Sequence, residues 1–258
     1  MISFLLTLAM GVGLAGSSSA ASTTVVSDLN HVTSITAEPE AKRLYDALID
    51  LGLPSAWPFA TYKPISSGGV RLGNLNIELG AGIPPIAGNQ FATFEPPTLD
   101  GLTAALDARG IKHSPPIPLY NGDELFYTRV ELPTYSQASR FTAQFCAYNF
   151  PSGNPTRVAP TNEAGIINVS RVVINSRDPG SWRKLMAPSK PSRGGTYRLS
   201  SGPLVQLRKG RSDSIDSLHL RVRNVSRAAR AFKAAGVRTK GEVVSLGTLR
   251  LRLVASGS

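Results

Sequence analysis

Apolar residues recur at helical spacing in three segments of the chain, and each segment ends in a glycine followed by an aliphatic residue. In the first segment, Leu44, Leu48 and Leu51 lie three and four positions apart, which places them on one face of a helix. A glycine directly after such a segment suits the left-handed position that ends a helix. The pattern therefore predicts helices that end at Gly52, Gly110 and Gly236. Residues that favour a helix start stand before them: Glu38-Pro39, Thr98, and Asn224 or Ser226.

Short runs typical of β-strands surround each helix. The runs before a helix cover residues 30–36, 90–94, 169–175 and 217–222, and those after it include residues 69–79, 125–132, 196–207 and 246–254. A shorter helix is expected over residues 178–186. The order predicts four βαβ(ββ) units in two pairs. More than one strand follows each helix, and no glycine-rich phosphate loop follows a strand, so a doubly wound nucleotide-binding sheet is disfavoured. We expect an α+β fold of mixed, curled sheets with helices packed on one face.

Composition places the chain among soluble globular proteins, because 41% of its 258 residues are hydrophobic and its mean hydropathy is −0.04. Cys146 is the only cysteine, which excludes a disulfide framework and a cysteine-based metal knuckle. Residues 1–20 resemble a secretory signal peptide, with an apolar run at 4–14 and Ser-Ser-Ala at its end. They predict a periplasmic or secreted protein, with a mis-assigned start of a cytosolic protein as the alternative. The apolar run is too short to cross a bilayer, so no transmembrane span is expected after signal removal.

Charge divides the chain into two unlike halves. Residues 1–167 carry 9 Lys and Arg against 13 Asp and Glu, a net charge of −4, whereas residues 168–258 carry 19 against 4, a net charge of +15. Residues 150–167 are rich in Pro, Asn and Thr and lack hydrophobic periodicity, as in a linker. We therefore expect one module pair at 28–149 and a second, basic pair at 168–256, with different electrostatic partners.

The first half resembles the vicinal oxygen chelate superfamily, which includes glyoxalases, bleomycin-resistance proteins and extradiol dioxygenases. The resemblance rests on His31-Val-Thr-Ser-Ile-Thr, on a helix ending in Leu51-Gly52-Leu53, and on Gly73-Asn-Leu-Asn-Ile-Glu-Leu. It covers residues 28–135 well and 168–255 loosely. It implies tandem βαβββ modules that form two curled mixed sheets with helices on the outer face, and a metal held by side chains of the first and last strands.

The same resemblance implies a set of metal ligands in the first module pair. His31 matches the first-strand ligand and Glu78 the last-strand ligand of module one. Glu131 stands at the expected last-strand position of module two. Its first-strand position, where family members often carry His, falls at Asn89 or Gln90, and Gln90 is the candidate ligand. One imidazole and two carboxylates make a nitrogen–oxygen site suited to Zn, Fe(II), Mn or Ni. The implied cofactor is a divalent metal that polarises a carbonyl or vicinal-oxygen substrate.

Alternating positions give the second half a basic strand face. His219 and Arg221 share one side of a predicted strand, and Arg250 and Arg252 share one side of the last strand. Because no acidic residue occupies these positions, a metal site is disfavoured there. Guanidinium groups favour an anionic small molecule or an anionic surface instead. Nucleic acid is disfavoured because the region lacks interleaved aromatic residues.

Three functions are consistent with this sequence. The first is a metal-dependent glyoxalase-like enzyme, a lyase, isomerase or ring-cleaving dioxygenase, that acts on a small carbonyl or vicinal-oxygen substrate. The second is a non-catalytic small-molecule-binding protein of the same fold, and the third is an exported interaction protein. Retention of His31 and Glu78 favours the enzyme. The absence of a first-strand His in module two favours the other two functions.

Overall fold

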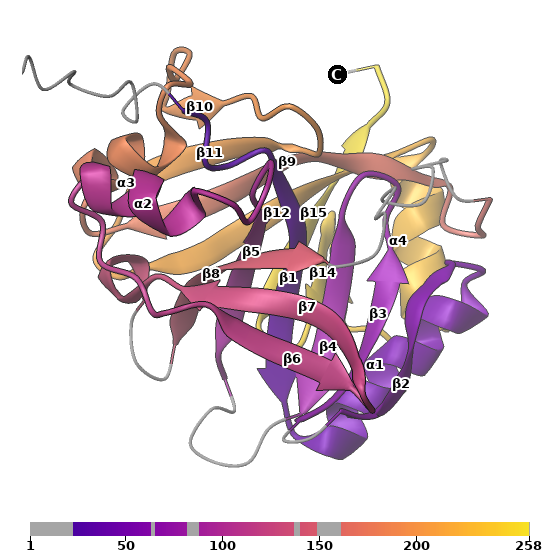
Figure 1. Ribbon diagram of the computed structural model, residues 1–258. Helices are drawn as coiled ribbons and strands as arrows, with labels where there is room; N and C mark the ends of the chain where they lie inside the picture. The colour runs from indigo at the N-terminus through magenta and orange to yellow at the C-terminus, as the bar shows by residue number, and fades with distance from the viewer. Residues whose placement is uncertain (1–22, 63–64, 82–87, 137–139, 149–160, 258) are drawn as a thin grey trace, which may run out of the picture.

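The computed structural model describes residues 23–62, 65–81, 88–136, 140–148 and 161–257 (Figure 1). The expected signal peptide at 1–20 and most of the expected linker at 150–167 lie outside these ranges. No helix in the described ranges is both long enough and apolar enough to cross a membrane.

The first half is an eight-stranded sheet built from two βαβββ modules. Module one consists of β1 (Asp28–Thr36), α1 (Glu38–Asp50), β2 (Ser55–Tyr62), β3 (Ile65–Arg71) and β4 (Asn76–Ala81). Module two consists of β5 (Gln90–Glu95), α2 (Leu102–Ala108), β6 (Ile117–Asn121), β7 (Glu124–Glu131) and β8 (Phe141–Tyr148), with a 3-10 turn at Pro133–Tyr135. The strand order is β2-β3-β4-β1-β5-β8-β7-β6. The first strands of the two modules, β1 and β5, therefore lie side by side at the centre.

The second half repeats this plan in a seven-stranded sheet. Module three consists of β9 (Ile166–Ser176), α3 (Pro179–Met186), β10 (Thr196–Tyr197) and β11 (Leu204–Lys209). Module four consists of β12 (Ser214–Val222), α4 (Val225–Ala234), β13 (Thr239–Lys240), β14 (Val243–Leu246) and β15 (Leu249–Ala255). The strand order is β10-β11-β9-β12-β15-β14-β13. Both sheets mix parallel and antiparallel pairs, and the predicted α+β fold of tandem modules with two curled mixed sheets is confirmed.

The glycines that follow α1, α2 and α4 have the predicted left-handed backbone. Gly52, Gly110 and Gly236 have φ angles of 80°, 63° and 74°. Apolar residues before them, such as Leu44 and Leu48 of α1, are buried against the sheet. The spacing of apolar residues and the terminal glycine therefore identified all three helices.

The predicted helix starts differ in outcome. Asn224 caps α4, because its side-chain oxygen accepts a hydrogen bond from the Arg227 amide at 2.8 Å. Thr98 does not cap α2: the helix starts after Gly101, and the Thr98 hydroxyl donates to the Asp100 carbonyl instead. Two prolines precede Thr98 and hold the chain extended there, so the predicted start was three residues early.

These two residues give a matched pair of cap variants. We expect Asn224→Ala to lower the free energy of unfolding by about 1 kcal/mol, because it removes a cap from an amide of the first helical turn. Thr98→Ala is expected to change it by less than about 0.5 kcal/mol, because that hydroxyl is exposed and caps no helix. Urea unfolding of both variants measures the difference. Equal losses would contradict the assignment of Asn224 as the cap.

One hydrophobic core joins the two halves. Trp182 of α3 is 1% exposed, and its ring packs against Phe94, Tyr135 and Phe141 of the first half, with ring centroids 6.0, 5.0 and 6.3 Å away. At the other end of the sheets, the Arg43 guanidinium of α1 donates to the Gly236 carbonyl after α4. Figure 1 shows the resulting arrangement, with α2 beside α3 on one side and α1 beside α4 on the other.

Candidate functional site

A β-bulge positions His31. The register of β1 against β5 shifts between Leu29 and His31, so the side chains of the consecutive residues Asn30 and His31 meet. The Asn30 amide nitrogen donates to Glu95 Oε2 at 3.1 Å, which leaves the Asn30 oxygen as an acceptor. His31 Nδ1 lies 2.9 Å from that oxygen. Nδ1 must therefore carry the hydrogen, and the lone pair of a neutral His31 is on Nε2.

Nε2 of His31 and the Glu78 carboxylate form an acceptor pair. Burial lowers the pKa of His31, and the nearby Glu78 carboxylate only partly opposes that effect, so the imidazole is neutral at pH 7. Its Nε2 lies 3.6 Å from Glu78 Oε2. Thr33, on the same strand face, donates its hydroxyl hydrogen to that oxygen at 2.7 Å. Two electron-rich atoms thus lie side by side with no proton between them. This arrangement calls for a cation or a hydrogen-bond donor.

We call the sheet face that bears His31, Thr33 and Glu78 the first cup. Trp57 of β2 lies over it and meets the His31 ring edge-on, with centroids 5.8 Å apart. Gly69 permits this approach, because a Cβ atom there would lie 2.4 Å from the Trp57 ring. The opposite sheet face carries Val32, Leu79 and other residues of the core beneath α1.

Module two contributes Tyr127, Cys146 and Tyr148 to the first cup. The pKa of each is raised, first by burial and further by neighbouring groups that include the Glu78 carboxylate. Cys146 is therefore a neutral thiol. Tyr148 donates its hydroxyl hydrogen to the Asn30 oxygen at 3.3 Å, and the rings of Tyr127 and Tyr148 have centroids 5.8 Å apart, so both rings lie on the side of the sheet that bears His31.

The structure brings His31 and Glu78 together but does not add Glu131 to them. Glu131 ends β7, the third strand of module two, whereas the last strand is β8, which corrects the strand assignment made from the sequence. Its carboxylate pairs with the Arg129 guanidinium at 3.0 Å and is 44% exposed. Within the described ranges, no group of three His, Cys, Asp or Glu side chains could hold a metal ion.

The amide of Gln90 is engaged elsewhere. Its nitrogen donates to the carbonyls of Ile215 and Thr248 at 3.2 and 2.8 Å, and its oxygen accepts from the Ile215 amide at 2.7 Å. These three bonds tie β5 to the second half. No hydrogen-bonding capacity of the amide nitrogen remains for the first cup, and its oxygen faces the second half.

Sequence reasoning missed the positions that correspond to His31 and Glu78 in module two. Thr93 of β5 lies opposite His31 of β1. In module one, His31 pairs with Asn76 of the last strand β4, and in module two, Thr93 pairs in the same way with Gln144 of the last strand β8. Glu78 and Cys146 then stand two residues further along their strands. Thr93 and Cys146 are thus the equivalents of His31 and Glu78. Alternation along β8, with Phe141, Ala143 and Phe145 in the core, could have indicated Gln144 and Cys146.

A divalent metal fits this donor set in part. A neutral imidazole oriented through Nδ1 and a carboxylate oriented by a hydroxyl are suitable ligands with suitable outer partners. The equivalent positions carry a hydroxyl and a protonated thiol, which are poor ligands. His31 and Glu78 therefore supply two donors, and further coordination would have to come from a bound molecule or from water.

The second sheet has a basic cavity of about 480 Å³. His219 and Arg221 of β12, two of the anion-site candidates from the sequence, line it together with Arg171 of β9 and Arg198, which sequence reasoning missed. Arg250 does not line it: its guanidinium pairs with the Asp216 carboxylate at 2.9 Å. Arg252 is exposed and does not line the cavity, although its charge lowers the pKa of the neighbouring His219. We call the sheet face that bears Arg171, His219 and Arg221 the second cup.

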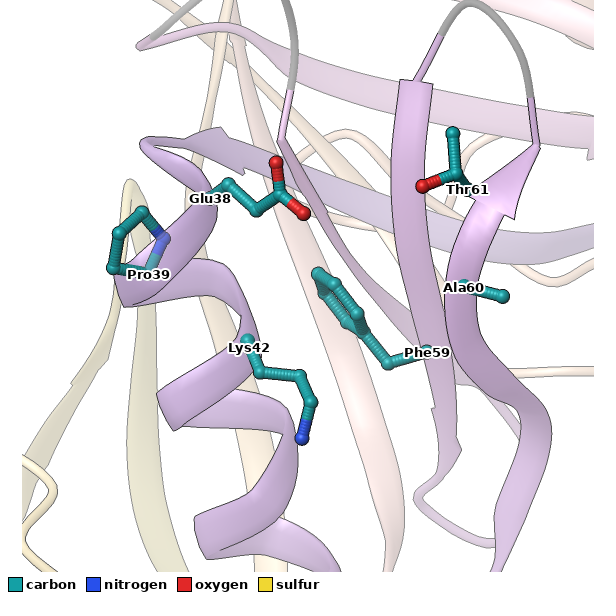
Figure 2. Close-up of a pocket in the computed structure, with 6 residues that line it drawn as sticks. All are labelled: Glu38, Pro39, Lys42, Phe59, Ala60 and Thr61. Carbon is teal, nitrogen blue, oxygen red and sulfur yellow. The ribbon is translucent and has the colours of Figure 1, made fainter.

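A third depression lies between the start of α1 and β2 (Figure 2). Its charged residues are of opposite sign, Glu38 and Lys42, and they flank the ring of Phe59. Lys42 already pairs with Asp46 at 2.6 Å. This depression contains none of the site residues predicted from the sequence, and its exposed charges specify no ligand chemistry.

Paired βαβββ modules in two curled sheets define the fold of the vicinal oxygen chelate superfamily, and comparison with solved structures agrees. The chain is similar to a hypothetical protein from Staphylococcus aureus, with a TM-score of 0.59, 8% identity, and coverage of 88% of this chain and 98% of that one. It is also similar to the Mn(II)-bound glyoxalase from Novosphingobium aromaticivorans, with a TM-score of 0.56, 11% identity, and coverage of 90% and 83%.

A third similar structure is 2,2',3-trihydroxybiphenyl 1,2-dioxygenase from Sphingomonas wittichii, with a TM-score of 0.52, 13% identity, and coverage of 89% and 91%. No protein-family model matches the chain, and no curated protein matches it in sequence. The protein therefore has the vicinal oxygen chelate fold, as predicted from His31, the glycine-ended helix and the Glu78 strand. At these identities the likeness shows the fold and not an activity.

Proposed function

We propose that the protein is a glyoxalase-like, metal-dependent enzyme that acts on a small carbonyl or vicinal-oxygen compound in the first cup. The observation that carries this proposal is the acceptor pair: Nε2 of His31 and Oε2 of Glu78, 3.6 Å apart and without a proton between them. A similar structure is named as a Mn(II)-bound glyoxalase and another as a dioxygenase, which supports a metal and a small oxygen-containing substrate.

His31 and Glu78 would hold the metal, which would supply Lewis-acid polarisation of a substrate oxygen. The chain's own residues have three further tasks. Asn30 fixes the imidazole tautomer, and Thr33 orients the carboxylate. Trp57 packs on the His31 ring and Tyr148 bonds to Asn30 beside it, and both would limit the access of water to the pair, which strengthens charge interactions there. With only two protein ligands, a chelating substrate with two neighbouring oxygens would complete the coordination, and this favours vicinal-oxygen compounds.

The second candidate is a non-catalytic small-molecule-binding protein of the same fold. The residues at the module-two positions favour it, because Thr93 and Cys146 replace the ligands that would complete a metal site. In this function the acceptor pair would receive hydrogen bonds from hydroxyl or amine groups of a bound molecule.

Metal analysis of purified protein separates the two candidates. If the protein is the metal-dependent enzyme, we expect that, after loading with Mn, Fe, Ni or Zn and desalting, it keeps about one equivalent of metal, because two oriented ligands hold the ion. We expect His31→Ala and Glu78→Gln to reduce the retained metal at least tenfold, since even changes to the outer partners of metal ligands commonly cost about ten- to a hundredfold. Elemental analysis, and the metal-induced rise in melting temperature, are the measurements.

The matched control is Glu131→Gln, which also removes one carboxylate from the same half and should retain the metal as the unchanged protein does. If the unchanged protein retains no metal and its melting temperature does not respond to any of the four ions, the metal-dependent enzyme is rejected and the binding protein remains.

A further inference from the structure

The cavity of the second cup has the composition of an anion site. Three guanidinium groups and one imidazole line it, those of Arg171, Arg198, Arg221 and His219. The remaining lining residues are apolar or neutral, and none is Asp or Glu. In the described ranges, no carboxylate pairs with any of these three arginines, although Arg177, Arg129 and Arg250 elsewhere each have an acidic partner.

We propose that this cavity binds a small phosphate ester. The site is separate from the first cup and does not depend on a metal there. Convergent cations without counter-charges repel one another, and a dianion between them relieves that repulsion. Guanidinium forks match the oxygens of a phosphate group.

Two residues that line the cavity each carry a buried polar atom without a hydrogen-bond partner. Arg221 Nε is a donor and Asn168 Oδ1 is an acceptor, and both are buried and unsatisfied. A buried polar atom without a partner costs roughly 1–3 kcal/mol. Both atoms are covered by the protein, so a ligand in the cavity would be held by the terminal nitrogens of the lining guanidinium groups and not by these two atoms.

A neighbouring residue orients one of the cationic groups of the cavity, that of Arg171. Gln206 Oε1 accepts from the guanidinium groups of Arg171 and Arg208 at 3.3 and 3.2 Å, and its amide nitrogen donates to the Gly194 carbonyl at 3.0 Å. Ser170 donates its hydroxyl hydrogen to the His219 carbonyl, which ties β9 to β12 beneath the cavity. An oriented arginine loses less side-chain entropy when an anion binds.

Residues from both halves of the molecule line the cavity. Asn74 of the turn between β3 and β4 lines the cavity, and its side-chain oxygen accepts from the Val169 amide at 2.9 Å. Arg198 and residues 199–203, which lead into β11, also line the cavity. A volume of about 480 Å³ is sufficient for a three- to six-carbon phosphate ester.

Calorimetric titration with glycerol 3-phosphate at about 0.15 M salt tests the proposal. We expect saturable binding that is tighter than that of inorganic phosphate, and no binding of glycerol. Arg221→Gln and Arg171→Gln should each weaken the affinity about tenfold or more, because each removes hydrogen bonds to a charged oxygen. Arg250→Gln removes the same charge from the same sheet but outside the cavity, and should change the affinity less than twofold. His31→Ala should leave it unchanged.

Several outcomes would overturn the proposal: no saturable binding of either phosphate compound, an equal loss in Arg250→Gln and Arg221→Gln, or tighter binding of succinate than of glycerol 3-phosphate. Thermal melting shows that each variant is folded, and Arg221→Gln is expected to melt no lower than the unchanged protein, because the guanidinium Nε has no partner to lose. A variant that keeps its stability and loses the ligand marks a binding residue.

His219 provides a second readout. Burial lowers its pKa, as do Arg171, Arg252 and Arg208, and only Asp216 acts in the opposite direction. A bound phosphate adds negative charge beside the ring and should raise the pKa of His219, so by linkage the affinity should increase as the pH falls through the range between the free and bound values. NMR titration of the His219 ring with and without glycerol 3-phosphate measures this. An unchanged pKa would contradict binding beside His219.

Discussion

Trp182→Ala is expected to lower the free energy of unfolding by about 3–5 kcal/mol, the usual cost of removing a large buried aromatic side chain. Trp182 is 1% exposed and contacts three aromatic rings of the first half, those of Phe94, Tyr135 and Phe141. The cavity left by the indole cannot close without moving α3 against the other half. For a chain of this size the loss corresponds to a fall in melting temperature of roughly 6–20 °C, which calorimetry measures.

The control for this variant is Tyr120→Ala, because Tyr120 is 61% exposed and its removal should cost less than about 0.5 kcal/mol. Trp182→Phe keeps part of the ring stack and should lie between the two. A loss below about 1 kcal/mol for Trp182→Ala would mean that α3 does not pack on the first half in solution.

Gln90→Leu is expected to destabilise the protein by about 3 kcal/mol or more. The substitution conserves much of the side-chain volume but leaves two carbonyls and one amide, those of Ile215 and Thr248, without their partner. Each buried group left unsatisfied costs about 1–3 kcal/mol. Denaturant unfolding measures the loss.

Gln144→Leu is the matched control for this variant. Gln144 is also a buried glutamine of the first sheet, but its amide bonds to Thr93 within the same half. We expect a smaller loss than for Gln90→Leu. An equal or larger loss would contradict the role of Gln90 as the polar link between the halves.

The modules could be predicted from the sequence because local patterns determine them. Leu44, Leu48 and Gly52 define a helix and its end without knowledge of any distant residue. The superfamily fold followed from the first-strand His31 and the last-strand Glu78, and the structure brings these two side chains together at 3.6 Å. Their spacing of 47 positions could be interpreted only through the module, since no short motif connects them.

Other site residues depend on register, which a single sequence does not reveal. A bulge in β1 makes Thr93 the partner of His31, whereas Gln90, three residues earlier, reaches the second half. Glu131 was assigned to the last strand because β8 follows a turn at Pro133–Tyr135 that the sequence analysis did not recognise. Arg171 joins His219 through antiparallel pairing of β9 and β12, so it could not be recognised from β12 alone.

Cys146 can serve as a natural chemical probe of the first cup. Alkylating reagents react with thiolates, and this thiol is 2% exposed with its pKa raised by burial. Since the chain has no other cysteine, every alkylated molecule has been modified at the wall of this cup. The rate of alkylation therefore measures how often β8 opens locally and exposes Cys146. Mass spectrometry can follow it without an engineered probe. A molecule that binds in the first cup would lower the alkylation rate of Cys146, and one that binds only in the basic cavity would leave this rate unchanged.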